Sequence, residues 1–370
     1  MQGRPASISG LRFGIVGPGW PFRFPIFTSI IESRGADRAS LRCQAGFPRF
    51  VPWNPKDNMT KSRDFIGPYR LARLIRVGST AEVWEAIEEH EQGRVALKML
   101  KQSLATNKAE ITLLKHEYNV AKDLKSPRII NVMEYREDAG RPCLVMELFS
   151  EMNMKQALRR GPESLAFMLD KIVEQSAEGL YYMHTKNWIH LDVKPDNFLV
   201  GRDGTVKLID FTIAEKKKGG FGQLFKSKVA KGTRSYMAPE QIRKKKCDER
   251  TDVYAFGCVL YELCTGKPPY TGDTPNDLLV KHLNASIPSP IVHNDNVTRE
   301  FADLVKSMMA KKPDGRPASM WEFLKVFRGT QIFRKRPRKP EVTVFDSMPG
   351  LKGADDMLRK GKPDPGLDVE

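Results

Sequence analysis

The chain lacks any apolar run near the roughly 18 residues that a membrane helix requires, and its densest early stretch, Phe24–Ile31, is far too short. Cysteine is also scarce, with five in 370 residues and no C-x-x-C pair among them. This spacing argues against a disulfide framework or a zinc site and indicates free thiols in a reducing compartment. We therefore predict a soluble, cytoplasmic protein with no transmembrane segment.

Acidic residues are outnumbered by basic ones, 45 against 61, which gives a formal net charge of +16. Part of the excess lies in short basic runs at 216–218, 244–246 and 334–339. No zinc-finger, RNA-recognition or helix-turn-helix pattern accompanies these runs, so we predict no specific nucleic-acid site. Solvated basic loops are the favoured interpretation, and acidic protein partners or an acidic membrane surface are the alternatives.

The two ends of the chain lack sustained hydrophobic periodicity. Residues 1–62 are rich in Arg, Pro, Gly, Ser and Phe and poor in acids, and residues 330–370 form a basic and then mixed-charge tail. We predict that both segments are disordered, because neither can bury a continuous apolar face. For the first segment two alternatives stay open, namely a transit peptide and a coding region whose true start is Met59.

The stretch His190–Phe211 carries the chemistry, and it reads H-L-D-V-K-P-D-N-F-L-V-G-R-D-G-T-V-K-L-I-D-F. Two short apolar strands, 198–200 and 205–209, are predicted on either side of a turn. Polar residues lie at the rim of this hairpin: Asp192, Lys194, Asn197 and Asp210. A carboxylate near an attacking hydroxyl, a cation near the moving phosphate and two oxygen ligands for magnesium would suit phosphoryl transfer. Ordinary turn residues, the alternative, would not require this joint spacing.

This spacing resembles the H-R-D-L-x-x-x-N and D-F-G patterns of the eukaryotic-type (Hanks-type) protein kinases, including their bacterial serine/threonine branch. The matching positions are His190, Asp192, Asn197, Asp210 and Phe211. The resemblance extends over residues 69–328. It implies an α+β, bilobal protein-kinase-like fold within a domain at 63–329. A small antiparallel-sheet lobe with one helix would span 63–149, and a larger, mainly helical lobe would span 150–329.

The resemblance also implies catalytic roles. Asp192 would orient the substrate hydroxyl and accept its proton, and Lys194 would support the transferred phosphate. Asn197 and Asp210 would hold Mg²⁺, the expected cofactor. Lys194 and Thr233 resemble the serine/threonine branch rather than the tyrosine branch. The implied activity is transfer of the γ-phosphate of ATP to serine or threonine hydroxyls of protein substrates.

A strand–turn–strand pattern at 69–86 lies where this family has its G-x-G-x-x-G-x-V loop, although only the middle glycine, Gly78, is present. Val95–Lys98 matches the V-A-I-K strand, whose lysine would grip the α- and β-phosphates. A helix is predicted over 108–125, where Ser126-Pro127 ends it. Its Glu117 is the implied partner of Lys98, and Glu110 is the alternative.

The adenine site is implied by an apolar strand at 142–149. Met146 would lie behind the adenine, residues 147–149 would form the hinge, and Leu199 would form the apolar floor. The complete ATP-binding set that the resemblance implies is Ile75, Gly78, Val83, Ala96, Lys98, Glu117, Met146, Glu147, Phe149 and Leu199.

Helices are predicted in the large lobe over 165–185, 253–264 and 321–328. The middle one is apolar almost all round and must be buried, with Asp252 placed to accept its N-terminal amides and Gly266 at its end. Residues 232–240 resemble the G-T-x-x-Y-M-A-P-E ending of the kinase activation segment. By the same resemblance, Arg316 would be the buried partner of Glu240.

Four positions depart from the family pattern. Leu191 replaces the arginine that gathers an activation-segment phosphate, so regulation through that contact is not expected. Thr212 replaces the glycine of D-F-G and should stiffen the segment, while Arg76 and Ala81 replace loop glycines and should hold the phosphates less closely. No metal or proton-transfer group is lost, so we predict an active enzyme. Autophosphorylation is predicted at Thr212, Ser227, Thr233 and Ser235.

Two other functions stay open. A pseudokinase would bind nucleotide or partners without chemistry, and the altered glycine loop and Thr212 motivate that hypothesis. A small-molecule phosphotransferase is the other, because some of these enzymes share the H-x-D-x-x-x-x-N core. Lys194, the A-P-E ending and the expected pairing of Glu240 with Arg316 argue against it.

Overall fold

The computed structural model describes residues 65–341 apart from 91, 139 and 218–232. The predicted disorder of residues 1–62, the possible start at Met59, Ser227 and the tail beyond 341 therefore lie outside the described residues. No helix in the described part is long and apolar enough to cross a membrane. The cysteines of the described part are free thiols, and Cys143, Cys258 and Cys264 are buried.

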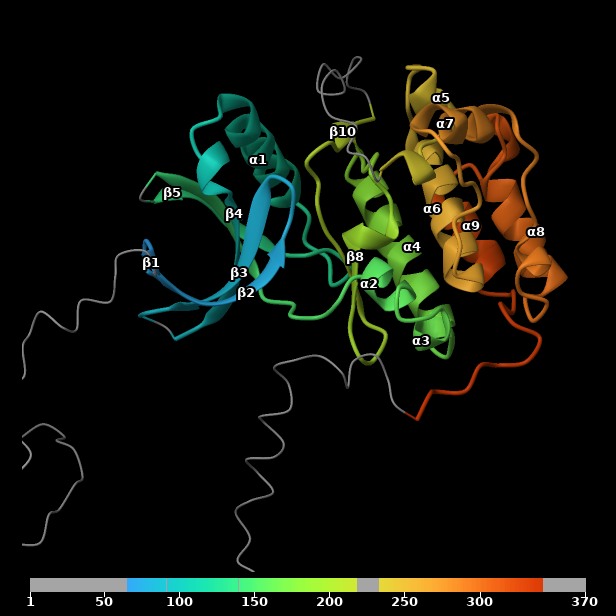
Figure 1. The fold of residues 1–370 in the computed structure, drawn as a ribbon, viewed down its shortest axis with the longest axis horizontal. Coiled ribbons are helices and arrows are strands. Elements are labelled where there is room, and N and C mark those ends of the chain that lie inside the picture. The colour runs from blue at the N-terminus through green and yellow to red at the C-terminus, as the bar shows by residue number, and fades with distance from the viewer. Residues whose placement is uncertain (1–64, 91, 139, 218–232, 342–370) are drawn as a thin grey trace, which may run out of the picture. The chain divides into compact units, whose positions relative to one another are not determined.

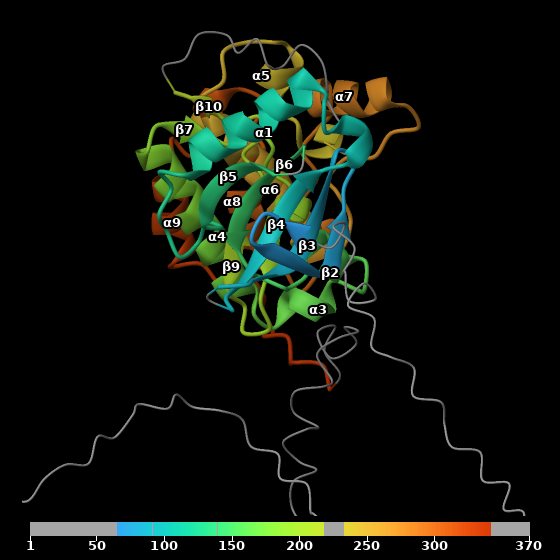
Figure 2. The same cartoon turned by 90° about the vertical axis from the view of Figure 1, so that its left-hand side faces the viewer.

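The small lobe is built on one antiparallel sheet with the strand order β1-β2-β3-β4-β6-β5 (Figure 1). The central strands β4 and β6 are apolar and mostly buried, as expected for strands covered on both faces. Helix α1 (Lys108–Ala121) starts at Asn107, whose side chain accepts the N–H groups of Ala109 and Glu110. The helix packs against β5 and β6 (Figure 2). The strands are β1 (Phe65–Ile66), β2 (Tyr69–Val77), β3 (Ala81–Glu88), β4 (Arg94–Leu100), β5 (Val132–Asp138) and β6 (Arg141–Glu147).

The large lobe is organised around α6 (Glu249–Thr265), in which every residue from Thr251 to Cys264 is buried. It packs against α4, α8 and α9, and the ring of its Phe256 lies between those of Phe198 and Phe323. Phe198 begins β8, so the hairpin β8–β9 is fixed to the core of this lobe. The predicted bilobal α+β fold is confirmed. The helices are α2 (Met154–Leu158), α3 (Glu163–Ala166), α4 (Leu169–Thr185), α5 (Pro239–Ile242), α7 (Pro275–Asn284), α8 (Arg299–Met308) and α9 (Met320–Phe327).

Two short antiparallel pairs complete the lobe: β8 (Phe198–Val200) with β9 (Val206–Leu208), and β7 (Trp188–Ile189) with β10 (Glu215–Lys216). The first pair is the predicted hairpin. The strand β9 leads directly into Asp210, and the turn before β8 carries Asn197. These supports place the polar residues of the predicted site on packed secondary structure.

Three predicted helices have clearly different bounds in the structure. The helix expected over 108–125 is α1, which already ends at Ala121, so Ser126-Pro127 does not terminate it. The helix expected over 165–185 is divided into α3 and α4. The break was not predicted because no glycine or proline lies at it and the helical periodicity of apolar residues continues across it. The buried helix expected from 253 starts at Glu249, because Asp248 and Thr251 form a capping box that precedes the apolar run. The prediction that Asp252 caps this helix was therefore wrong.

Residues 330–335, predicted to begin a disordered tail, pack against the large lobe instead. The amide N–H of Thr298 donates to the carbonyl of Ile332 at 3.0 Å, and that of Arg334 donates to the carbonyl of Asn296 at 2.7 Å. The side chain of Ile332 is buried. The buried Ile332, which precedes the basic run at 334–339, thus extends the folded domain beyond the predicted boundary at 329.

Candidate active site

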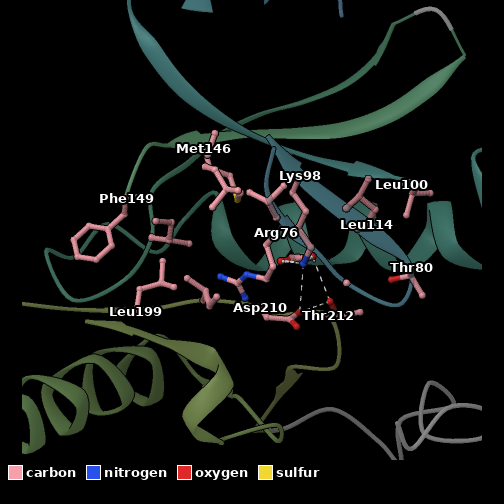
Figure 3. A pocket seen from close by; sticks show the side chains of 18 of the residues that line it. Arg76, Thr80, Lys98, Leu100, Leu114, Met146, Phe149, Leu199, Asp210 and Thr212 are labelled. Atoms are coloured by element: carbon pink, nitrogen blue, oxygen red, sulfur yellow. Dashed lines mark hydrogen bonds and ion pairs between the residues drawn. The ribbon is translucent and has the colours of Figure 1, made fainter. Parts of the chain in front are cut away.

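A pocket between the two lobes is lined by the glycine loop, β4, α1, the segment after β6, Leu199 and the residues that follow β9 (Figure 3). All ten residues of the ATP-binding set inferred from the sequence line this pocket, as does Asp210. Its lining combines apolar and charged groups. Met146 and Leu199 lie to one side of Lys98 and Asp210, and Leu100 and Leu114 lie to the other side (Figure 3).

Lys98, on β4, forms an ion pair with Glu117 on α1. Its Nζ lies 2.7 Å from both carboxylate oxygens of Glu117 and 3.5 Å from Oδ1 of Asp210. Burial lowers the pKa of Lys98, but the carboxylates of Asp210 and Glu117 outweigh this effect, so the pKa lies above its ordinary value. The ammonium group therefore stays charged inside the pocket, where a phosphate is a suitable ligand.

Residues 190–197 carry Asp192 and form the catalytic loop, which is held in place by Asp252. Its two carboxylate oxygens accept the backbone N–H groups of His190 and Leu191, each at 2.8 Å. Asp252 sits in the first turn of the buried helix α6, so the loop is tied to the core of the large lobe. A third bond joins the same carboxylate to Nε2 of His184 at 2.8 Å.

Asp192 uses its two carboxylate oxygens differently. Oδ2 accepts hydrogen bonds from Nζ of Lys194 at 2.6 Å and from Nδ2 of Asn197 at 3.2 Å. Oδ1 is buried and has no hydrogen-bond partner within the described part of the chain. Burial raises the pKa of Asp192, and the ammonium of Lys194 opposes the increase. Oδ1 is therefore available to accept a proton from a substrate hydroxyl, as a general base does.

The hinge is braced through the side chain of Glu147 at the end of β6. Its Oε1 accepts the backbone N–H of Asn131 at 2.8 Å and Nζ of Lys207 at 2.7 Å. Lys207 belongs to β9 of the large lobe, so this ion pair links the hinge to the hairpin that carries Leu199. Both bonds are accepted by Oε1, so one oxygen of the carboxylate is fixed at the hinge.

Asn197 and Asp210 supply a carboxamide oxygen and a carboxylate, the hard oxygen ligands that Mg²⁺ prefers. No cluster of three His, Cys, Asp or Glu side chains that could hold a metal was found in the described residues. This donor set fits an ion that keeps waters and shares ligands with substrate phosphates. Burial raises the pKa of Asp210, but Lys98, the hydrogen bond from Thr212 and Lys194 outweigh it. The net pKa lies below the ordinary value, so the carboxylate is ionised.

A family model described as "Protein kinase domain" matches residues 69–326. The chain belongs to the protein kinase family. It is 34% identical over 254 residues to the serine/threonine-protein kinase PknH of Mycobacterium bovis, covering 69% of this chain and 42% of the relative. It is 32% identical over 266 residues to the serine/threonine-protein kinase PknE of Mycobacterium tuberculosis, covering 70% and 46%. A probable serine/threonine-protein kinase of Streptomyces coelicolor is 30% identical over 262 residues, covering 70% and 39%. The matches span less than half the length of these relatives.

In this member of the protein kinase family, the expected pair between Glu240, the glutamate of A-P-E, and Arg316 forms. Nη1 and Nη2 of Arg316 lie 2.7 and 2.9 Å from the two carboxylate oxygens of Glu240. The arginine side chain is 0% exposed and that of the glutamate 7% exposed. Thr251 on α6 donates to the same carboxylate at 2.9 Å. The bidentate pair therefore fixes the end of the activation segment to the core.

The position of the H-R-D arginine is occupied by Leu191, which is only 4% exposed. Its backbone N–H is bound to Asp252, and its carbonyl accepts Nε2 of Gln241 at 3.0 Å. An apolar side chain inside the protein thus replaces the cation that would receive a phosphate.

Two polar residues in the pocket were noted in the sequence only as departures from the pattern. Thr212 lies beside Asp210 and Glu117, and its hydroxyl is 2.5 Å from Oδ1 of Asp210. Because this hydroxyl is already bound inside the site, these contacts argue against Thr212 as an autophosphorylation site. Arg76, at the first loop-glycine position, directs its side chain into the pocket towards Asp210 (Figure 3). Burial lowers the pKa of Arg76, and the charges of Asp210 and Asp196 oppose the decrease.

Proposed function

We propose that this chain is an ATP-dependent kinase that phosphorylates serine or threonine hydroxyls of protein substrates. The observation that supports it most is the buried and unpaired Oδ1 of Asp192, a residue whose carboxyl interacts electrostatically with Asp210. Asp210 in turn contacts Lys98, which is paired with Glu117. Lys98 and Asp210 line the pocket, whereas Asp192 is not among the lining residues, so its electrostatic interaction with Asp210 is what connects the base to this pocket. Lys194 and the named relatives favour serine and threonine over tyrosine.

Each residue has a defined task in this reaction. The substrate hydroxyl oxygen attacks the γ-phosphorus of ATP, the bond from that phosphorus to the bridging oxygen breaks, and ADP leaves with the bonding electrons. Asp192 orients the hydroxyl and takes its proton on Oδ1. Lys194 balances charge on the transferred phosphate, and Lys98, held by Glu117, grips the α- and β-phosphates.

Mg²⁺ is the proposed cofactor, with Asn197 and Asp210 as the residues that would hold it. When bound, the ion would neutralise negative charge on the phosphate oxygens. The chain's own contribution is to keep Asp210 ionised and Asn197 in place. Nδ2 of Asn197 donates to the carbonyl of Asp192 at 2.8 Å, which turns the amide nitrogen towards the loop.

The decisive test is transfer of labelled phosphate from ATP to generic protein substrates. Lys98→Met and Asp192→Asn should each reduce transfer by about a hundredfold or more. Lys171→Met, which alters an exposed lysine paired with Asp203, should leave transfer unchanged. Thermal unfolding of each variant would verify that it is folded.

Two other outcomes would favour the other hypotheses. Nucleotide binding without any phosphoryl transfer would identify a pseudokinase. Labelling of amino-alcohols or antibiotics while proteins stay unlabelled would identify a small-molecule phosphotransferase. The cytoplasm is the proposed location, and acidic proteins are proposed partners of the exposed basic run at 244–246.

A further inference from the structure

The side chain of Thr212 occupies a position at which the D-F-G pattern has no side chain. Its hydroxyl oxygen lies 2.5 Å from Oδ1 of Asp210 and 3.3 Å from Oε2 of Glu117. Lys98 contacts the same two carboxylates. Thr212 therefore closes a ring of four polar side chains in the lining of the pocket, as the dashed lines in Figure 3 show.

A threonine hydroxyl has one proton to donate, and the shorter contact identifies Asp210 as its acceptor. A hydroxyl that donates to a carboxylate oxygen at this distance makes a charge-assisted hydrogen bond. Oδ1 thus receives Thr212 from one side and the ammonium of Lys98 from another. Because both donors bind Oδ1, they restrict rotation of the Asp210 carboxylate and so fix the orientation of Oδ2.

The backbone around Asp210 also needs support. Asp210 has φ of +67°, in the left-handed region, which is strained for a residue other than glycine. The next residue, Phe211, is fully buried, and its ring centroid lies 5.7 Å from that of His190. The hydroxyl of Thr212 adds a bond back to Asp210 on the other side of this anchor.

Orientation of this carboxylate matters for a magnesium ligand. Mg²⁺ requires nearly ideal octahedral geometry, so a carboxylate that is already aimed loses less freedom on binding the ion. Residues that hydrogen-bond a metal ligand commonly contribute 10- to 100-fold to metal affinity or activity. Glycine at this position would leave the orientation of Asp210 to Lys98 alone.

We propose that Thr212 is a positioning residue whose hydroxyl holds Oδ1 of Asp210 so that Oδ2 faces the magnesium ion of bound MgATP. This inference rests on the proposed function only in taking Asp210 as a magnesium ligand. It assigns to the hydroxyl, and not to the stiffness of a β-branched side chain, the reason for threonine at this position.

The test compares variants of the full chain by calorimetric titration with a non-hydrolysable ATP analogue, with and without MgCl₂. Thr212→Val removes the hydroxyl and keeps the shape, Thr212→Ala removes both hydroxyl and bulk, and Thr212→Ser keeps the hydroxyl. In Thr212→Val and Thr212→Ala, the increase in nucleotide affinity that MgCl₂ produces should be smaller by about tenfold or more. Ser should keep it, and affinity without magnesium should be alike in all variants.

Thr205 provides a matched control, because its hydroxyl donates to Oδ2 of Asp203 at 2.6 Å with the same two-residue spacing. This pair lies in the β8–β9 turn and is absent from the residues that line the pocket. Thr205→Val should leave the magnesium dependence of nucleotide affinity unchanged. Thermal unfolding would confirm that each variant is folded.

The proposal is overturned if Thr212→Val keeps the wild-type magnesium dependence, or if Ser loses as much as Val. It is also overturned if nucleotide binding by the wild type does not depend on magnesium. A third outcome is that the wild type transfers no phosphate while the magnesium dependence of its nucleotide affinity is lost in Thr212→Val and kept in Thr212→Ser. This combination would still support the role of Thr212. That result would refute only the proposed kinase activity.

Discussion

At Asp192, burial and a neighbouring cation act in opposite directions on one carboxylate. Burial raises its pKa, and the ammonium of Lys194, 2.6 Å from Oδ2, lowers it. Asp192 accepts a proton only when ionised. A base whose pKa is raised is protonated as the pH falls through that raised value, so kinase activity should be lost there. The acidic limb of the pH profile should therefore lie above the ordinary aspartate pKa of about 4.

Lys194→Gln should move this acidic limb to higher pH. The substitution removes the charge that opposes burial, and an adjacent opposite charge typically shifts a carboxyl pKa by about 1–3 units. The measurement is kcat/KM for a peptide substrate as a function of pH, with saturating ATP. Lys171→Gln, at an exposed pair with Asp203, should leave the limb in place. A limb that does not move in Lys194→Gln would contradict this account of Asp192.

Arg76 places a cation where the family pattern has a glycine. The loss of this glycine predicts a weaker hold on the phosphates, but the side chain enters the pocket near Asp210, where its guanidinium should contact the phosphates of ATP. Arg76→Gln should raise KM for ATP about tenfold, the loss expected for one hydrogen bond to a charged group. Arg70→Gln, at an exposed position on the same strand, should have no effect. A lower KM in Arg76→Gln would show instead that the arginine obstructs the nucleotide.

The elements around the site differ in how far the sequence predicts them. The strand at 198–200 has its predicted bounds, because an apolar run with turn residues on both sides has one reasonable interpretation. The direction of Arg76 was not predictable, since the pairing of β2 with β3 shifts register between Leu74 and Arg76. The bond from Thr212 to Asp210 was also not predictable, because it depends on the left-handed backbone at Asp210.

The buried pair of Glu240 and Arg316 connects α5 to the loop that follows α8. Arg316→Met should cost about 3–5 kcal/mol of unfolding free energy, because it leaves the carboxylate of Glu240 buried without its charged partner. Urea unfolding measures this loss, and adding Glu240→Gln should recover part of it. Arg299→Met is the control, because its pair with Asp303 is 84% and 61% exposed and should matter by less than about 1 kcal/mol. Equal losses in both arginine variants would contradict the assignment.

On the scale of the whole molecule, contacts from both lobes converge on the pocket. Lys98 and Glu117 connect the sheet to α1, Glu147 and Lys207 connect the hinge to β9, and Asp252 ties the catalytic loop to α6. The motif spacing predicted which residues would meet, because each motif lies on a strand or loop of fixed length. It did not predict the contacts that hold the hinge and the catalytic loop in place. Those contacts join side chains from segments that are far apart in the sequence.

These contacts predict how the kinase responds to phosphorylation of its activation segment. A phosphate stabilises such a segment only when cations are placed to receive it. At the position of the H-R-D arginine, the buried Leu191 offers none, and its backbone is already held by Asp252 and Gln241. Protein treated with a phosphatase, with loss of phosphate verified by mass spectrometry, should therefore keep most of its activity towards a peptide. A large loss that is regained on rephosphorylation would show that other cations take over the part of the absent arginine.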